Sequence, residues 1–248
     1  MADLDDTMSQ LAVANRILAR EDVVDAFGHV SVRHPDRPEC FLLARSRSPE
    51  LVGRDDLLEF GPDGEPVNDN GPAPYAERFI HAGIFAARPD VQSVVHTHAE
   101  PLLPFGITGT PLKPVHHLGS RIGHVVPLWD IRDSFGDATD LLVTNMDHGR
   151  DLAEGLGGNR MVLMRGHGNA VATESLENAV LTAIYAQVNA RVQTASMMMA
   201  LARGKGMEAV NALTDDEISA SRGLGKKGSL GGSRSWEYFE RRADTAGV

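Results

Sequence analysis

The feature of the sequence that most constrains its fold is a β-rich run, Ser93-Val94-Val95, that leads directly into His96-Thr97-His98. Residues i and i+2 of a strand project to the same face of a sheet, so both imidazoles can face one ion. Ala99-Glu100-Pro101 then ends the run, which places the pair at a strand end, where open α/β sheets place their sites. Solvent-facing histidine pairs of this spacing are common, so the pair alone leaves metal binding open.

A third histidine, His167, lies in the run Arg165-Gly166-His167-Gly168-Asn169, directly after the β-rich segment 161–164. The glycines on both sides let the backbone approach closely and free the imidazole from neighbouring side chains. Three neutral imidazoles that leave a fourth position open suit a catalytic Zn²⁺, Mn²⁺, Co²⁺ or Fe²⁺. The alternative is a turn histidine that hydrogen-bonds to the backbone, and the spacing alone does not separate the two interpretations.

An acidic residue, Glu77, begins a predicted helix just after Pro74-Tyr75-Ala76. A carboxylate in the first turn of a helix is stabilised by the helix dipole, which is a sufficient structural reason for it. The functional interpretation makes Glu77 an acid/base close to the metal ion. His81 follows four residues later on the same helix face, where it can orient Glu77, bind a ligand or simply pack.

Apolar periodicity and turn residues predict a chain in which helices and strands are mixed. We expect helices over residues 8–20, 76–87 and 176–203, short helices at 101–105 and 147–156, and strands at 28–33, 40–44, 57–60, 91–98, 125–128 and 161–164. Only a turn is expected between the last strand and the long helix. The mixture implies a layered α/β arrangement.

The 248 residues are expected to form a single domain, residues 1–248, with a glycine-rich C-terminal extension from about residue 204. Short helices are expected near Asp215 and Trp236. Because Trp236, Tyr238 and Phe239 are too many large aromatic residues for a free tail, we expect them to dock on a neighbouring surface.

Charge and cysteine content limit the partners and the compartment. The chain has 24 Lys plus Arg and 34 Asp plus Glu, so its formal net charge is −10. This balance argues against nucleic-acid and anionic-membrane partners, and no apolar stretch approaches the roughly 20 residues that span a bilayer. The single cysteine, Cys40, excludes an intramolecular disulfide and, beside an apolar run, is expected to be a buried, inert thiol. The acidic residues 1–6 are unlike a secretory signal, so these features together favour the cytoplasm.

Several of these runs resemble the class II aldolase/adducin family. The stretch from Pro74 through Arg88-Pro89-Asp90-Val91 to His98-Ala99 is similar to the core of the family, and Arg165-Gly166-His167-Gly168 is similar to its downstream metal-ligand motif. The similarity extends from about residue 11 to residue 203. It implies a three-layer α/β/α sandwich of the class II aldolase type, with a mixed, largely antiparallel central sheet. It also implies a homo-oligomer, a tetramer or higher, with sites near the subunit interfaces.

For the site, the resemblance implies one divalent metal ion per subunit, which would be Mn, Zn, Co or Fe, bound by His96, His98 and His167. The glutamate that matches Glu77 serves as the acid/base in this family and lies near or on the ion in the unliganded state.

Two N-terminal loops depart from the sugar-phosphate aldolases of the family, which bind phosphate with Gly-Asn-x-Ser and Thr-Pro-Ser-Gly sequences. The first loop here is Gly28-His29-Val30-Ser31, with His29 where asparagine is expected, and the second is Ala44-Arg45-Ser46-Arg47-Ser48. Because a planar guanidinium group matches a carboxylate bidentately, Arg45, Ser46 and Arg47 predict a small-molecule carboxylate substrate. Surface ion pairing is the alternative for the arginines, and a core position is the alternative for His29.

These loops and the tail around Trp236-Glu237-Tyr238-Phe239 resemble the decarboxylase branch of the family, whose members act on hydroxylated aromatic or pyridine dicarboxylates or on a carboxymuconic semialdehyde. The resemblance therefore implies a metal-dependent decarboxylase, for example of a dihydroxyphthalate. A metal ion chelated by a hydroxyl or keto oxygen of the substrate would stabilise the enolate that forms when the carbon–carbon bond breaks. Glu77 is the first candidate to protonate the carbanion carbon, and His29 and His81 are further candidates.

His116, His117 and Tyr185 are secondary candidates for substrate binding. The two histidines follow Pro114-Val115 in a predicted loop, where neighbouring side chains point in different directions, so at most one is expected to reach the site. For Tyr185, on the long helix, a core or interface position is the alternative. Two other functions stay open: a class II aldolase or epimerase acting on a sugar phosphate, and a non-catalytic adducin-like binding module, which would lack the metal ligands.

Overall fold

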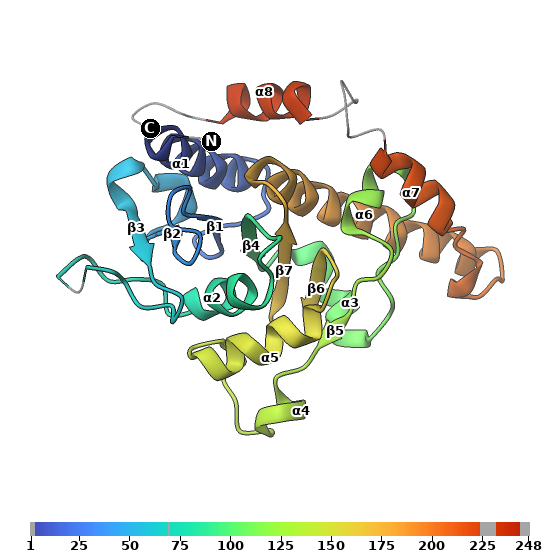
Figure 1. The fold of residues 1–248 in the computed structure, drawn as a ribbon. Coiled ribbons are helices and arrows are strands. Elements are labelled where there is room, and N and C mark those ends of the chain that lie inside the picture. The colour runs from blue at the N-terminus through green and yellow to red at the C-terminus, as the bar shows by residue number, and fades with distance from the viewer. Residues whose placement is uncertain (1–2, 69, 224–231, 244–248) are drawn as a thin grey trace.

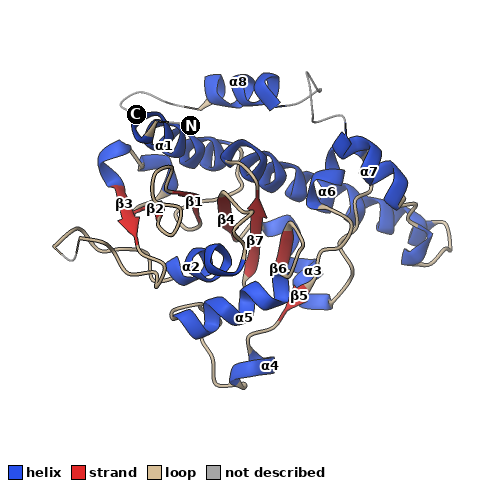
Figure 2. Ribbon diagram, in the orientation of Figure 1, coloured by secondary structure: helices blue, strands red, loops and turns tan. Residues whose placement is uncertain are grey.

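A seven-stranded sheet with the strand order β3-β2-β1-β4-β7-β6-β5 forms the centre of the computed structural model (Figure 2). Every neighbouring pair is antiparallel except β5 and β6, which are parallel. The strands are β1 (His29–Arg33), β2 (Phe41–Ala44), β3 (Leu57–Phe60), β4 (Ser93–Thr97), β5 (Leu128–Trp129), β6 (Met161–Met164) and β7 (Gly168–Thr173). The structure describes residues 3–68, 70–223 and 232–243.

Helices cover both faces of this sheet. Figure 1 shows α1, α6 and α8 on one side of the strands and α2 and α5 on the other. The helices are α1 (Leu4–Arg20), α2 (Arg78–Ala87), α3 (Leu103–Thr108), α4 (Arg132–Phe135), α5 (Met146–Leu156), α6 (Leu176–Ala202), α7 (Asp215–Gly223) and α8 (Gly232–Arg242). The predicted three-layer α/β/α fold with a mixed, largely antiparallel sheet is confirmed.

Alternate residues of the central strand β4 enter two separate apolar cores. Val95 packs with residues of α1 and α6 in one core, whereas Val94 packs with residues of α2 and α5 in the other. Both valines are fully buried. Because side chains alternate along a strand and His96 is two residues after Val94, the His96 ring faces the α2–α5 layer.

Strand β7 is the main element that the sequence pattern missed, since only a turn was predicted between residues 164 and 176. The structure places β7 between β4 and β6, and all six of its residues are buried. A strand covered on both faces lacks the polar alternation that marks a half-exposed strand. The prediction was wrong, and its correction places His167 in the short turn between two paired strands.

Other elements were predicted correctly in type but with shifted ends. α1 begins at Leu4 rather than at residue 8, and α2 begins at Arg78 rather than at residue 76. β4 ends at Thr97, one residue before His98, and β5 comprises only Leu128–Trp129. The short helices expected near residues 215 and 236 are confirmed as α7 and α8.

The C-terminal aromatic residues dock only in part. Phe239 is buried and Trp236 is partly buried against the core formed by α1 and α6, whereas the Tyr238 side chain is 54% exposed. The docking prediction is therefore correct for two of the three residues. Three glycines of the glycine-rich extension, Gly225, Gly228 and Gly231, lie outside the described residues.

Two further expectations concern the cysteine and the membrane. Cys40 is buried, and burial raises the pKa of its thiol, in agreement with the inert role that was expected. Among the residues that the structure describes, no helix combines the length and the apolar character that a membrane span needs.

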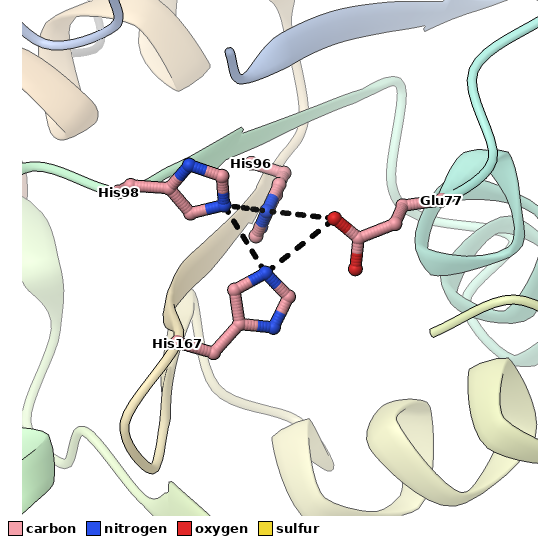
Figure 3. A group of neighbouring side chains, drawn as sticks. All are labelled: Glu77, His96, His98 and His167. Atoms are coloured by element: carbon pink, nitrogen blue, oxygen red, sulfur yellow. Dashed lines mark hydrogen bonds and ion pairs between the residues drawn. The ribbon is translucent and has the colours of Figure 1, made fainter. Parts of the chain in front are cut away.

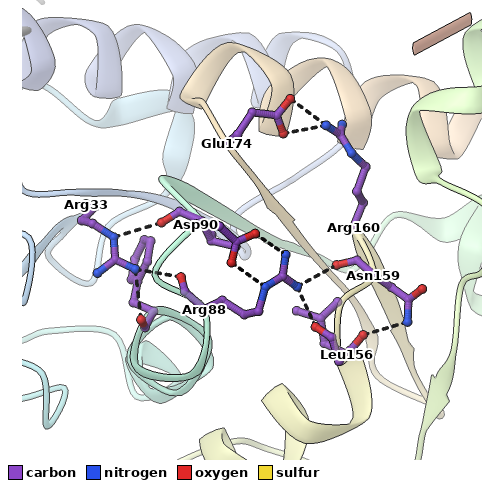
Figure 4. A network of polar contacts seen from close by, with 10 residues as sticks. Arg33, Arg88, Asp90, Leu156, Asn159, Arg160 and Glu174 are labelled. Atoms are coloured by element: carbon purple, nitrogen blue, oxygen red, sulfur yellow. Dashed lines mark hydrogen bonds and ion pairs between the residues drawn. The ribbon is translucent and has the colours of Figure 1, made fainter. Parts of the chain in front are cut away.

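An ion-pair network holds the turn that precedes β4 (Figure 4). Arg88 donates to the two carboxylate oxygens of Asp90 at 2.8 and 2.7 Å, and to the carbonyl oxygens of Gly157 and Asn159 at 2.6 and 3.2 Å. Arg33, at the end of β1, donates to three carbonyl groups between residues 85 and 91. The two arginines tie the α2–β4 turn to β1 and to the α5–β6 turn, and so set the point at which β4 begins.

α2 and α5 cross at a contact that requires glycine in both helices. A Cβ atom added at Gly83 would lie 2.2 Å from the carbonyl oxygen of Gly149, and one added at Gly149 would lie 2.2 Å from the carbonyl oxygen of Phe79. These distances are far below van der Waals contact. Because α2 begins directly after Glu77, this crossing also sets the position of that carboxylate.

We predict that Gly149→Ala lowers the free energy of unfolding by roughly 1–3 kcal/mol, since a methyl group must force the two helices apart. Gly158→Ala is the matched control, because its Cβ would meet nothing within 4 Å, and it is expected to change stability by less than about 0.5 kcal/mol. Urea denaturation measures both values. Equal stability of the two variants would contradict the close helix crossing.

Candidate metal centre

Four side chains from three separate parts of the chain converge at the end of β4 (Figure 3). His96 is in β4 and His98 follows the end of that strand. His167 lies in the turn between β6 and β7, and Glu77 precedes the first residue of α2. One ligand atom from each residue lies within 4.8 Å of all the others. The structure thus brings together the three histidines and the glutamate that the sequence pattern selected.

The three imidazoles direct their Nε2 atoms at a common point. His98 Nε2 lies 3.0 Å from His96 Nε2 and 3.1 Å from His167 Nε2. The Oε2 atom of Glu77 lies 3.4 Å from His167 Nε2 and 3.8 Å from His96 Nε2. A tetrahedral ion with bonds of about 2.0–2.1 Å would place its nitrogen ligands about 3.3 Å apart, close to these separations.

Hydrogen bonds give His96 the tautomer that a metal ligand needs. Its Nδ1–H donates to the carbonyl oxygen of Asn169 at 3.0 Å, which leaves the Nε2 lone pair free. Asn169 is held in turn, because its Nδ2 donates to Thr97 Oγ1 at 2.7 Å. Neither Asn169 nor Thr97 was selected from the sequence. Thr97 lies between His96 and His98, and Asn169 directly follows the motif that contains His167. This donor set fits a divalent metal ion.

Burial and hydrogen bonding set the charges in the centre. Burial lowers the pKa of His96 well below its ordinary value and also lowers the pKa of His98. Burial alone would raise the pKa of Glu77, but the hydrogen bond to His167, the neighbouring imidazoles and the Val143 amide together lower it to about 2. The lowered pKa values of His96, His98 and Glu77 favour neutral rings at these two histidines beside a carboxylate, which is the state that binds a divalent cation.

The Glu77 prediction needs one correction. The residue occupies the N-cap position of α2, not its first turn, and its side chain makes no capping hydrogen bond. Instead, its Oε1 atom accepts a hydrogen bond from the Val143 backbone N–H at 3.0 Å. The helix dipole is therefore not the contact that orients this carboxylate, which points away from the helix end and toward the histidines.

Two glycines let neighbouring backbone approach the histidine strand. A Cβ atom at Gly168 would lie 2.2 Å from the Thr97 carbonyl oxygen. Gly28 has a φ of +92°, and its Cβ would lie 2.6 Å from a Val24 methyl carbon and 3.0 Å from the carbonyl oxygen of His96. Glycine at both positions permits the close pairing that places His29 and His167 beside β4.

His29 and His81, the two further acid candidates, lie next to the centre. β1 pairs with β4 so that His29 is opposite His96, with ring centroids 5.1 Å apart. His29 Nδ1 lies 2.7 Å from His81 Nε2, and His81 Nδ1 lies 2.6 Å from Ser31 Oγ. His81 is fully buried with both ring nitrogens engaged, so its only route to a substrate is through His29. Ser31 was not selected from the sequence, and its place two residues after His29 on a strand was the available signal.

The predicted carboxylate-binding loop is held by an internal ion pair. Arg45 Nε donates to Asp56 Oδ1 at 2.7 Å, and Arg47 Nη1 donates to Asp56 Oδ1 and Oδ2 at 2.9 and 2.8 Å. Two guanidinium groups against one buried carboxylate leave the loop with a net positive charge. Ser46 lies between the arginines with its side chain exposed.

Tyr75 connects this loop with the centre, although it was not selected from the sequence. Its hydroxyl donates to the carbonyl oxygen of Arg47, and its ring packs against the His29 ring with centroids 4.7 Å apart. The only sequence signal was its position two residues before Glu77. Through Tyr75, the arginine loop adjoins the side of the centre where His29 lies.

The secondary candidates His116, His117 and Tyr185 lie elsewhere in the described chain. Among the residues that the structure describes, no hydrogen bond, ion pair or ring contact joins these three side chains to the four residues of the centre. His117 is exposed, and the Tyr185 ring lies 6.0 Å from the Arg121 guanidinium. Their roles in substrate binding stay predictions that these contacts do not support.

A hollow of about 180 Å³ opens beside His98. Its walls combine His98 with three acidic residues and three small or apolar ones: Asp22, Asp25, Glu100, Val23, Val24 and Ala99. Carboxylates repel an anion, so this hollow is a poor place for the carboxylates of a substrate. The arginine loop offers the opposite charge on another side of the centre.

Comparison with known proteins identifies relatives over most of the chain. Residues 9–194 match the protein family described as Class II Aldolase and Adducin N-terminal domain. The decarboxylase tropJ of Talaromyces stipitatus is 39% identical over 247 residues, which cover 94% of this chain and 92% of that protein. The 3,4-dihydroxyphthalate decarboxylase of Arthrobacter keyseri is 27% identical, and the aligned region covers 95% of this chain and 93% of that protein.

Solved structures share the fold. An L-fuculose 1-phosphate aldolase from Glaciozyma antarctica PI12 superposes with a TM-score of 0.73 at 21% identity, over 97% of this chain and 91% of that one. At this identity the likeness concerns the fold alone.

We predict that the purified chain binds one divalent metal ion and that His167→Ala weakens this binding by at least about 10- to 100-fold, because a ligand atom is lost. His124→Ala is the control, since His124 pairs with Asp215 away from the centre. Elemental analysis after dialysis against buffered metal measures both. Undiminished metal in His167→Ala, or an equal loss in the control, would rule out this ligand set.

Proposed function

The chain belongs to the class II aldolase and adducin family, in the branch with curated members named decarboxylases, and on that premise we propose that it is a metal-dependent decarboxylase. The proposed substrate is a hydroxylated aromatic dicarboxylate such as a dihydroxyphthalate, or a related pyridine dicarboxylate or carboxymuconic semialdehyde. One observation carries the proposal: His96, His98, His167 and Glu77 converge in a chain that is 39% identical to a decarboxylase over 94% of its length.

The three imidazoles would hold the ion and leave a position open for the substrate. When bound, the ion supplies a Lewis acid next to the substrate oxygen on which negative charge develops as the carbon–carbon bond breaks. The substrate in the name of the Arthrobacter keyseri relative, 3,4-dihydroxyphthalate, has such an oxygen, because one hydroxyl is ortho to a carboxylate. This chemistry supports the proposed substrate class.

Glu77 is proposed to move one proton between substrate atoms. With its pKa lowered to about 2, it is a carboxylate when the substrate binds, and it can accept the proton of the substrate hydroxyl. Glu77 delivers this proton to the ring carbon that bears the departing carboxylate, which converts the ring to its keto tautomer. The bond to the carboxylate carbon then breaks, CO₂ leaves, and the electron pair restores the aromatic ring with the negative charge on the oxygen, which water reprotonates after product release.

The arginine loop is proposed to hold the carboxylate that the product retains. Arg45 and Arg47 each use part of the guanidinium group on Asp56 and keep other N–H donors for a ligand. Ser46 lies between them. Because Tyr75 contacts both Arg47 and His29, a ring-sized substrate at the centre could extend toward this loop.

The sugar-phosphate aldolase or epimerase is the weaker alternative. Its support is a shared fold at 21% identity, whereas the loops that would bind phosphate contain His29 and the arginines. A non-catalytic adducin-like module would need no set of four converging ligand atoms, and this chain has one.

We expect a panel of o-hydroxy aromatic dicarboxylates to include one from which the metal-loaded protein releases CO₂ stoichiometrically. Exhaustive chelation should abolish the release, and Mn²⁺, Zn²⁺, Co²⁺ or Fe²⁺ should restore it. Glu77→Gln is expected to lower kcat by about 10²- to 10⁴-fold, because proton transfer is lost. The matched control is Glu100→Gln, whose exposed side chain lies near His98 but outside the centre.

Three results would contradict the proposal. These are the absence of CO₂ from every acid with metal fully loaded, CO₂ release that survives chelation, and cleavage of a sugar phosphate without any decarboxylation. The last would establish the aldolase alternative.

We further predict that Arg47→Ala raises KM at least about tenfold for the dicarboxylate and leaves kcat within about twofold, since a lost binding contact acts equally on ground and transition states. An analogue without the retained carboxylate should show no such rise. Arg37→Ala, which removes a surface ion pair with Glu59, is the control. Identical KM changes for both substrates would assign Arg47 a structural role through Asp56 alone.

A homo-oligomer, a tetramer or higher with sites near subunit interfaces, and a cytoplasmic location remain part of the proposal. Exposed apolar side chains at the C-terminal end of α6 support the oligomer: Met198, Met199 and Leu201 are 65%, 68% and 53% exposed. Light scattering of the purified protein tests it, and a monomer at micromolar concentration would contradict it.

A further inference from the structure

A chain of three polar side chains runs from the core to the candidate metal centre. Ser31 Oγ lies 2.6 Å from His81 Nδ1, and His81 Nε2 lies 2.7 Å from His29 Nδ1. Ser31 and His81 are fully buried, and His29 is 4% exposed. Ser31 and His29 lie two residues apart on β1 and so share the face that is covered by α2, the helix that carries His81.

The hydrogen bonds among Ser31, His81 and His29 can be donated in either of two directions. In the first, the Ser31 hydroxyl donates to His81 Nδ1, His81 Nε2–H donates to His29 Nδ1, and the proton of His29 is on Nε2. In the second, both rings carry the proton on Nδ1, Ser31 accepts, and His29 Nε2 is a bare lone pair. Burial lowers the pKa of His81 to about 3, so a doubly protonated ring is not a third choice.

The fate of the serine proton separates the two directions. Among the described residues, Ser31 Oγ has no partner other than His81. In the second direction the hydroxyl proton would therefore be buried without an acceptor, which is unfavourable. The first direction satisfies the serine proton and the His81 N–H, and it leaves as the free donor the Nε2–H of His29, which is not among the buried atoms without a partner. Ser93, on the neighbouring strand, does not alter this, because its hydroxyl donates to the Ser31 carbonyl oxygen and not to Oγ.

We infer that Ser31 and His81 are positioning residues that hold His29 as the tautomer with its proton on Nε2, so that a neutral N–H faces the substrate beside the metal centre. This inference rests on the proposed function for its substrate and on the geometry for its tautomer. Neither ring changes its charge. A neutral imidazole N–H donates a hydrogen bond to a developing oxyanion and keeps its proton.

This arrangement gives each of the three acid candidates a different role. His81 cannot contact a substrate, because it is fully buried and both of its nitrogens are used. His29 stabilises negative charge on a substrate oxygen without transferring a proton. Proton transfer is then left to Glu77, the one carboxylate among the four residues of the centre.

The tautomer can be measured directly on the zinc-loaded protein by ¹⁵N NMR with labelled histidine, with His29→Gln used to assign the His29 signals. We expect the His29 Nε2 to show the chemical shift and the one-bond proton coupling of a protonated nitrogen, and Nδ1 those of a bare one. A His29 that is protonated on Nδ1 in the wild type would overturn the inference. Because this measurement needs no substrate, it stands or falls independently of the decarboxylase proposal.

Substitutions test whether this hydrogen-bond relay, defined as Ser31, His81 and His29, matters for turnover. Ser31→Ala should give a mixture of His29 tautomers and lower kcat by about tenfold or more, with KM within about twofold. Ser31→Thr, which keeps the hydroxyl, should restore the wild-type tautomer and kcat. Ser93→Ala is the matched control, because it removes an equally buried serine hydroxyl that bonds to Ser31 but lies outside the relay.

An unchanged His29 tautomer and kcat in Ser31→Ala would contradict the relay. So would an equal loss of kcat in Ser93→Ala, which would indicate a general packing effect. If Ser31→Ala does not fold, the wild-type spectrum alone decides the tautomer.

Discussion

β4 lies between β1 and β7, and the register of its backbone hydrogen bonds is the constraint on which the candidate centre depends. Pairing with β1 sets His29 opposite His96, and pairing with β7 brings the Asn169 carbonyl to the His96 Nδ1–H. A slip of one residue would turn His96 toward the α1–α6 layer, because side chains alternate along a strand. Gly28 and Gly168 permit this register, since a Cβ at either position would collide with neighbouring atoms.

The register assembles three imidazole nitrogens whose lone pairs meet at about the separation that one metal ion requires. An ion that binds these nitrogens in the folded chain should also stabilise the fold, because the unfolded chain does not bring them together. Aldol cleavage and decarboxylation both leave an electron pair that such an ion can stabilise through a neighbouring oxygen. The metal centre therefore does not distinguish the two reactions. In the proposed function the distinction rests on residues outside it, in the loop of Arg45 and Arg47 and at His29.

Local pattern was sufficient where neighbours in sequence define the geometry. The i, i+2 spacing of His96 and His98 and the glycines around His167 located the centre, and the order of helices and strands with the family resemblance predicted the three layers. Pairing between distant segments could not be predicted in this way. β7 has no polar alternation because both of its faces are buried, and the contacts of Ser31 with His81 cross from a strand to a helix. Asp56, which holds both loop arginines, likewise has no local sequence signal.

The central claim is that three imidazoles of one chain bind a single divalent cation. X-ray absorption spectroscopy of the zinc- or cobalt-loaded protein measures this most directly, since it reports the number, type and distance of the ligand atoms. The account predicts a first shell with three imidazole nitrogens at about 2.0–2.1 Å for zinc, with the remaining ligands oxygen. A shell with one or no imidazole, or a shell unchanged in His96→Ala, would contradict it.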